Sequence, residues 1–199
     1  MEGATAVANI LKMEGVEFVG CVPYQPMLEA AAIAGIRPII FRNESTGVHM
    51  VDGFARVTNG KRTGVFLMQN GPGAENAFGG VAQAFAESVP ILLLPAGMPR
   101  SRRGVHPNFY PTRSFETITK WSAEVNLVER IPELMRRAFT KLRSGRPGPV
   151  LLEIPNDVAG EELAEERFDY EPPTTVRTSG DPEAIRRAVR ALLAAERPI

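Results

Sequence analysis

The sequence predicts an α/β protein of three layers, in which helices cover both faces of a mostly parallel sheet. Short apolar runs alternate along the chain with segments in which apolar residues recur at helical spacing. The connections between them are short, and this alternation is typical of parallel strands joined by crossover helices. One run, 91–94, is apolar without alternation, as expected for a strand that is covered on both faces.

The expected elements follow one another from residue 18 to residue 154. Strands are expected at 18–22, 36–41, 63–68, 89–95 and 150–154, and helices at about 27–34, 45–57, 74–86 and 131–142. The arginine-rich stretch 97–111 interrupts this order and is expected to be a long loop, a kind of segment that is usually functional or mobile in a compact domain. Arg100, Arg102 and Arg103 are expected to be solvated there, although a carboxylate, a phosphate or a flavin is an alternative partner.

The chain is expected to divide into three parts. Residues 1–157 form the α/β domain, and the polar, proline-marked stretch 158–180 is interpreted as a linker. Asp181 and Pro182 then resemble an N-cap followed by proline at the first helical position, and apolar residues line one face of the segment that follows. We expect 181–199 to be the first helix of a second domain that is incomplete in this chain.

Composition narrows the classes of function. The 23 basic and 23 acidic residues balance, so no excess charge points to nucleic acid or to an anionic membrane as partner. The single cysteine, Cys21, excludes an intrachain disulfide and a cysteine metal cluster, and it is expected to be a buried small group in a strand. The start of the chain lacks the pattern of a signal peptide. We therefore expect a cytoplasmic protein with no metal site of its own.

Glu44 is the principal candidate for chemistry, because it lies between an expected buried strand and an expected helix. Ligands of open parallel sheets gather at the carboxyl ends of strands. Taken alone, the residue is most simply an ordinary acid at a helix N-terminus. The loop Gly71-Pro72-Gly73 has a similar position and lets backbone amides approach a ligand, but it is neither a dinucleotide fingerprint nor a Walker loop.

An ordered set of motifs is far more specific than any one of them. It comprises Arg42-Asn43-Glu44, His49-Met50-Val51-Asp52-Gly53-Phe54-Ala55-Arg56, Asn70-Gly71-Pro72-Gly73-Ala74-Glu75-Asn76 and Ser88-Val89-Pro90-Ile91. This set resembles the N-terminal pyrimidine-binding domain of thiamine diphosphate enzymes, with acetolactate synthase and pyruvate oxidase as the nearest subgroup. The resemblance spans residues 4–157 and implies the thiamine diphosphate-binding fold, and 181–199 resembles the opening of that family's central domain.

The resemblance implies roles for individual residues. Glu44 would hydrogen-bond N1′ of the aminopyrimidine and so promote loss of the C2 proton and formation of the ylid, which attacks a 2-oxo acid. Pro23, Tyr24, Pro72 and Asn76 match positions that contact the cofactor. Tyr24 departs from the family's usual Pro-Gly and would crowd that turn.

Substrate contacts are expected from other positions. Phe115 with Glu116 matches, one residue short, a family segment that reaches the active site. Gln69 and Asn70, at a strand end, are expected either to hydrogen-bond the substrate or to form the turn. Ser45-Thr46-Gly47 replaces the family's usual sequence after the acid and leaves the substrate class open.

The implied function is that of the cofactor-binding part of a thiamine diphosphate-dependent 2-oxo acid decarboxylase or carboligase. In the family a separate domain, with a Gly-Asp-Gly signature absent from this sequence, holds the diphosphate and Mg²⁺, and some members also bind FAD. The active site forms between subunits, so we expect a homo-oligomer and an inactive isolated chain. The alternatives are a subunit of a split decarboxylase, a non-catalytic binding module, and a flavodoxin-like nucleotide-binding domain.

Overall fold

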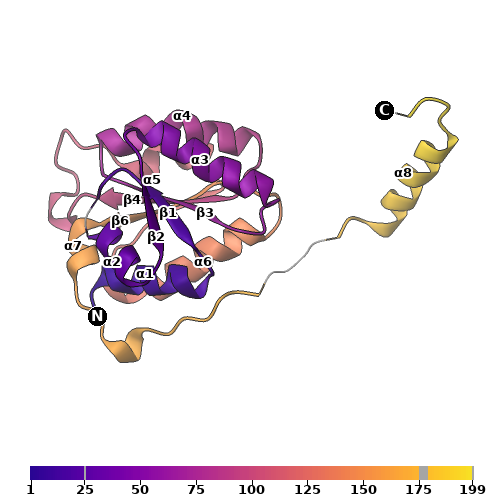
Figure 1. The fold of residues 1–199 in the computed structure, drawn as a ribbon. Helices are drawn as coiled ribbons and strands as arrows, with labels where there is room; N and C mark the ends of the chain where they lie inside the picture. The colour runs from indigo at the N-terminus through magenta and orange to yellow at the C-terminus, as the bar shows by residue number, and fades with distance from the viewer. Residues whose placement is uncertain (25, 175–178, 199) are drawn as a thin grey trace.

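The structure is a computed structural model that describes residues 1–24, 26–174 and 179–198. In this described part, six parallel strands form one sheet in the order β2-β1-β3-β4-β6-β5 (Figure 1). The strands are β1 (Phe18–Cys21), β2 (Arg37–Ile40), β3 (Gly64–Met68), β4 (Ile91–Gly97), β5 (Trp121–Glu124) and β6 (Val150–Pro155). The predicted parallel α/β class is therefore confirmed, and the structure adds the strand order, which the alternation of elements leaves open.

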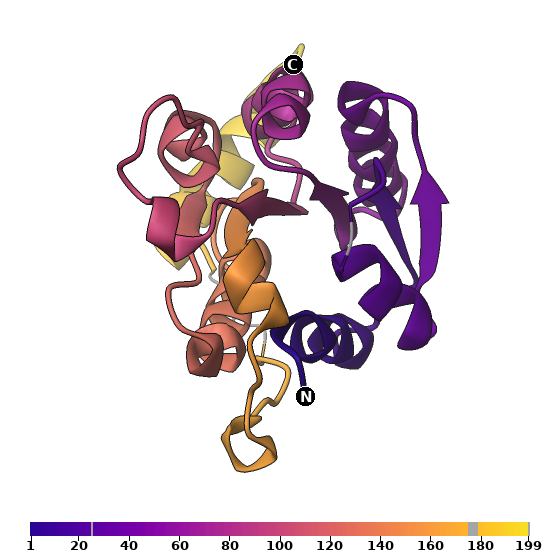
Figure 2. The ribbon, with the colours of Figure 1, turned by 90° about the vertical axis from the view of Figure 1, so that its left-hand side faces the viewer.

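Helices cover both faces of this sheet, as the two views in Figures 1 and 2 show. One face carries α1 (Gly3–Met13), α2 (Met27–Ile33), α6 (Ile131–Arg143) and α7 (Asn156–Gly160). The opposite face carries α3 (Glu44–Val57) and α4 (Pro72–Ala86), and α5 (Pro111–Ser114) leads into a phenylalanine that packs there. Short 3₁₀ turns complete the domain: η1 (Arg100–Arg102), η2 (Glu116–Ile118), η3 (Val128–Arg130) and η4 (Glu165–Arg167).

The central strand β4 separates two hydrophobic cores. All of its residues are buried, as predicted from its unbroken apolar run. Leu92 and Leu94 belong to the core under α1, α2 and α6, whereas Ile91 and Leu93 belong to the core under α3 and α4. Successive side chains of a strand point to opposite faces, so a strand between two helical layers must be apolar at every position.

Four elements and part of a loop differ from the expectations. The helix α1, the short helices α5 and α7 and the edge strand β5 are absent from the expected set. Helix α1 has no side-chain cap at Glu2, and the four residues of β5 are only half-buried, so neither gives a strong local pattern. The expected loop 97–111 is shorter, because Gly97 still belongs to β4 and Arg100–Arg102 form a 3₁₀ turn.

The segment expected as a linker packs against the domain over its first half. Leu163 and Tyr170 are buried in the core that contains α1, and the amino group of Met1 donates a hydrogen bond to the carbonyl of Leu163 over 2.9 Å. Helix α8 (Pro182–Ala194) contains no buried residue. Its predicted cap is confirmed, since Asp181 Oδ1 accepts a hydrogen bond of 2.7 Å from the amide of Ala184. No helix in the described ranges is long and apolar enough to cross a membrane.

Candidate functional site

Several of the predicted site residues follow β1 and β3, two neighbouring strands after which the chain continues toward opposite edges of the sheet. Strand β1 connects to β2 on one side, and its neighbour β3 connects to β4 on the other. Open α/β sheets bind ligands at such a switch point, beyond the carboxyl ends of the strands. Pro23 and Tyr24 follow β1, and Gln69 to Gly73 follow β3.

Glu44 is the first residue of α3 and is held in a buried position. Asn43 caps the helix by accepting a hydrogen bond of 3.2 Å from the amide of Thr46, which fixes the direction in which α3 begins. Only 4% of Glu44 is exposed. The side-chain amide of Asn76, on α4, donates to Glu44 Oε2 over 3.2 Å. No donor among the described residues reaches Oε1, so that oxygen is available to a partner outside this part of the chain.

Two glycines allow the close approach around this carboxyl group. A Cβ at Gly73 would lie 3.1 Å from Glu44 Oε1 and 2.7 Å from Gln69 Cγ. A Cβ at Gly47, one turn after Glu44 on α3, would overlap the ring of Phe66. The absence of side chains at these positions lets α4 begin beside the acid and lets α3 lie close to β3.

The start of α4 also borders a cavity of about 610 Å³. Gly71 precedes the helix with φ of 65°, a left-handed conformation that favours glycine, and Pro72 occupies the first turn. Asn70 lines the cavity, and its buried Oδ1 has no hydrogen-bond partner among the described residues. The remaining wall is formed by Met98 and by residues of the segment that follows β4.

Tyr24 and Phe115 are held by residues other than Glu44 and Asn76. The hydroxyl of Tyr24 donates to Asn156 Oδ1 over 2.9 Å, and burial raises the pKa of Tyr24 to about 12. Phe115 is fully buried, with ring centroids 5.1 Å from Phe78 and 6.5 Å from Phe109. The structure thus brings together Glu44 and Asn76, whereas the other predicted side chains contribute packing or lie exposed, as Pro23, Gln69 and Pro72 do.

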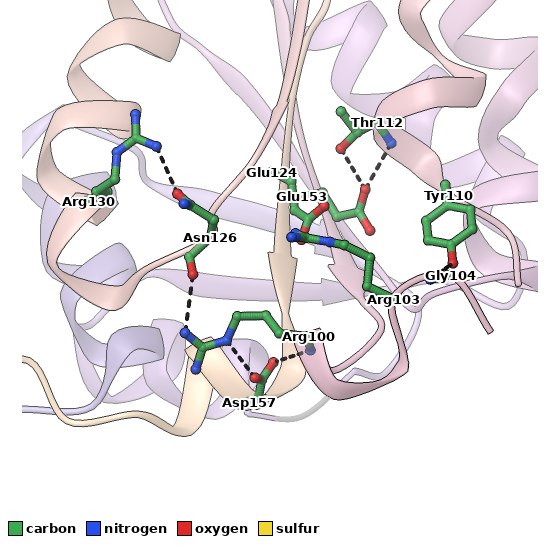
Figure 3. A network of polar contacts seen from close by, with 10 residues as sticks. All are labelled: Arg100, Arg103, Gly104, Tyr110, Thr112, Glu124, Asn126, Arg130, Glu153 and Asp157. Carbon is green, nitrogen blue, oxygen red and sulfur yellow. Dashed lines mark hydrogen bonds and ion pairs between the residues drawn. The ribbon is translucent and has the colours of Figure 1, made fainter.

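Sequence reasoning missed the buried acid Glu153, in the middle of β6. It is 3% exposed, and its Oε2 accepts hydrogen bonds from the amide of Thr112 over 2.9 Å and from the hydroxyl of Thr112 over 2.6 Å (Figure 3). Burial raises the pKa of Glu153. A single acid inside the apolar run Val150 to Ile154 is the pattern that could have identified it.

The arginines after β4 form ion pairs. Arg100 Nε lies 2.7 Å from Asp157, and its Nη2 lies 2.5 Å from Glu161 (Figure 3 shows the pair with Asp157). Arg103 pairs with Glu124. The expectation of a solvated side chain is therefore wrong for Arg100, which is half-buried against acidic partners that are distant in sequence but adjacent in the fold. Arg103 is exposed, as expected, although it is paired. Arg102 is exposed, as expected.

No group of three or more histidine, cysteine or acidic side chains in the described part of the chain is arranged to hold a metal ion. The chemistry that this chain offers is that of carboxyl groups, hydroxyls and amides. A buried carboxyl group with one free oxygen can share a proton with a basic nitrogen of a ligand.

Comparison with known proteins gives a consistent result. Residues 1–120 match the family model of the thiamine pyrophosphate enzyme, N-terminal TPP binding domain. The whole chain aligns, at 32% identity, with 35% of a probable acetolactate synthase large subunit from Methanocaldococcus jannaschii and with 36% of the acetolactate synthase isozyme 3 large subunit from Escherichia coli K12. It is 33% identical to the glyoxylate carboligase of Escherichia coli O157:H7, over 34% of that protein. The chain thus spans about a third of the length of the curated relatives it matches.

Proposed function

This chain belongs to the thiamine pyrophosphate enzymes, of which it has the N-terminal TPP binding domain, and from that premise we propose that Glu44 activates the cofactor (thiamine diphosphate) in a 2-oxo acid decarboxylase or carboligase. The observation that carries the proposal is the state of the Glu44 carboxyl group. It is buried, Asn76 holds one oxygen, and no described donor reaches the other.

The residues present fit the pyrimidine end of this cofactor. The aminopyrimidine has a basic nitrogen, N1′, that requires a carboxyl partner, and Glu44 Oε1 is free for it. Gly73 leaves the space beside that oxygen open, since a Cβ there would stand 3.1 Å away. We propose that Glu44 and Asn76 hold the pyrimidine ring and that Pro23, Tyr24 and Pro72 shape its surroundings.

The chemistry divides between the cofactor and the protein. When bound, thiamine pyrophosphate supplies an acidic carbon, C2 of its thiazolium ring, which can add to the carbonyl of a 2-oxo acid and accept electrons as carbon dioxide leaves. Glu44 would hold the cofactor at N1′ and share a proton with it, which would make the 4′ amino group a better base toward C2. Asn76 fixes the orientation of Glu44, and the buried position excludes water from that proton.

The substrate and the remaining cofactor contacts are proposed from the relatives. The names acetolactate synthase and glyoxylate carboligase support a small 2-oxo acid as substrate. We propose that a domain outside this chain holds the diphosphate and Mg²⁺, that the active site forms between subunits of a homo-oligomer, and that this chain alone is inactive. Gln69 and Asn70 are proposed on the substrate side, and FAD binding and a cytoplasmic location stay predictions.

The test replaces Glu44→Gln in the complete enzyme and measures hydrogen–deuterium exchange at C2 of bound thiamine pyrophosphate. We expect the exchange rate to fall by roughly 10²–10⁴-fold, the range typical of a lost general acid–base group. Glu29→Gln is the matched control, because Glu29 is an exposed acid in the first turn of α2. An unchanged exchange rate in the Glu44 variant, with cofactor bound, would show that Glu44 is not the activating group.

A further inference from the structure

A second cavity, of about 550 Å³, lies on the β5–β6 side of the sheet. Its volume falls within the roughly 300–1,000 Å³ typical of small-molecule sites. Its lining includes Arg103, Tyr110, Thr112, Ser122, Glu124 and Glu153. His106 borders both this cavity and the one beside α4, so the segment after β4 separates the two.

The buried carboxyl group of Glu153 is the distinctive feature of this second cavity. Thr112 satisfies Oε2 with two hydrogen bonds, whereas none of the described donors reaches Oε1. A Cβ at Gly97 would stand 3.0 Å from Oε1, so glycine keeps the space beside this oxygen open. Glu153 lines the cavity, so its Oε1 is open to a ligand that donates a hydrogen bond.

The charges around Glu153 determine which donor would fit. Arg103 is already paired with Glu124, as Figure 3 shows in its view of the two side chains beside Glu153. Arg113 and Glu116, which also line the cavity, are both exposed. The arginine beside Glu153, Arg103, is thus already paired, and Arg113 is exposed, which disfavours the binding of an anion at Glu153.

A metal ion does not fit this cavity either. Glu153 and Glu124 line it, but the described residues contain no cluster of three or more side chains suited to metal coordination. The walls instead carry an aromatic ring, Tyr110, and two hydroxyls, Thr112 and Ser122. An organic ligand with a positive end and an apolar body matches that lining.

We propose that this cavity is a binding site for a small organic ammonium compound, whose amino group donates to Glu153 Oε1 while its apolar part lies against Tyr110. The site is separate from Glu44, which lines neither cavity. Because burial favours the protonated form of Glu153 in the free protein, arrival of a cation allows the carboxyl group to ionise.

The test measures binding to the full chain by two-dimensional NMR titration with three probes of the same shape: benzylamine, benzyl alcohol and benzoate. We expect benzylamine to shift the amide signal of Thr112 and to bind most tightly. We expect Glu153→Gln to weaken benzylamine binding by roughly 30-fold or more, as for removal of one partner of a buried charge pair. The exposed residue Glu116 lines the same cavity, and Glu116→Gln should change the affinity less than about threefold.

A measurement on the unmodified chain keeps the proposal testable if the Glu153 variant fails to fold. Nuclear Overhauser contacts from the benzyl CH₂ of bound benzylamine should reach the protons of Tyr110 and Ser122. Contacts to other regions alone would overturn the proposal. It would also be overturned if benzyl alcohol or benzoate bound as tightly as benzylamine, or if a folded Glu153→Gln chain bound benzylamine unchanged.

Discussion

Glu44 and Glu153 are two buried carboxyl groups built in the same way at different ends of one sheet. In each, Oε2 accepts hydrogen bonds from the protein, Oε1 has no described donor, and a glycine leaves space beside Oε1. The distance from that oxygen to a Cβ built on the glycine is 3.1 Å at Gly73 and 3.0 Å at Gly97. The shared geometry supports our proposals that each of these oxygens binds a ligand.

The two neighbourhoods differ in the groups that donate to the carboxyl group. The donor to Glu44 is the side chain of Asn76, an exposed residue near the start of α4. The donors to Glu153 are the amide and hydroxyl of Thr112, and the carboxyl group lies inside β6, between two other strands. We therefore expect the site of Glu44 to be the more adjustable of the two and the site of Glu153 to be the more rigid.

The largest effect on stability is expected when Gly97, the glycine beside Glu153, is replaced. A Cβ at Gly97 would meet Glu153 Cγ at 3.0 Å and the backbone at Pro155 Cα at 3.1 Å, so Gly97→Ala should lower the free energy of unfolding by about 1–3 kcal/mol. Gly73→Ala should change it by less than about 1 kcal/mol, because exposed Gln69 can turn away and alanine favours the helix. Urea unfolding of both variants measures the difference, and equal costs would contradict the difference in rigidity.

Removal of the Asn76 amide, which donates to Glu44, should affect the rate of C2 exchange rather than stability. Asn76→Ala in the complete enzyme should slow C2 exchange by about tenfold, because Glu44 Oε2 loses its hydrogen bond. Since Asn76 is exposed, the free energy of unfolding should stay within about 0.5 kcal/mol. Gln83→Ala, an exposed amide further along α4, is the control and should alter neither quantity. A loss of stability without a change in exchange would assign Asn76 a purely structural role.

Tyr24 should contribute to stability through its hydrogen bond to Asn156. Tyr24→Phe removes the hydrogen bond to Asn156 and should cost about 0.5–1.5 kcal/mol in thermal or urea unfolding. Because the pKa of Tyr24 is raised to about 12, this cost should be the same from acidic to neutral pH. A cost that varies between those conditions would show that another group titrates with the contact.

The smallest expected effect is a pH dependence that belongs to Glu153. Burial raises its pKa, so the folded protein holds this proton more tightly than the unfolded chain does. Its contribution to stability is therefore lost as the pH rises from the ordinary glutamate value, about 4.3, through the raised pKa. Glu153→Gln lacks this titration, so the free energy of unfolding of the wild type should fall relative to the variant over that interval. Parallel pH profiles from urea unfolding would contradict the assignment.

The sequence predicts the sheet and the Glu44 site better than the Glu153 site, for a physical reason. Every residue of β4 is buried, so its unbroken apolar run predicts a covered strand. Glu44 lies at a junction between strand and helix, where ligands of parallel sheets bind. The ion pairs of Arg100 link residues 57 and 61 positions apart, and such distant pairs leave no local pattern. The strand β5 and the cavity beside Glu153 likewise depend on the strand order, which appears only in the folded chain.

The central claim is a direct contact between Glu44 and N1′ of the cofactor, and nitrogen NMR of thiamine pyrophosphate labelled with ¹⁵N at N1′ tests it most directly. In the complete enzyme, the N1′ signal should show the shift of a nitrogen that shares a proton with a carboxyl group. Glu44→Gln should abolish that shift, whereas Glu29→Gln should retain it. The same N1′ signal in the wild type and the Glu44 variant, with cofactor bound in both, would contradict the account.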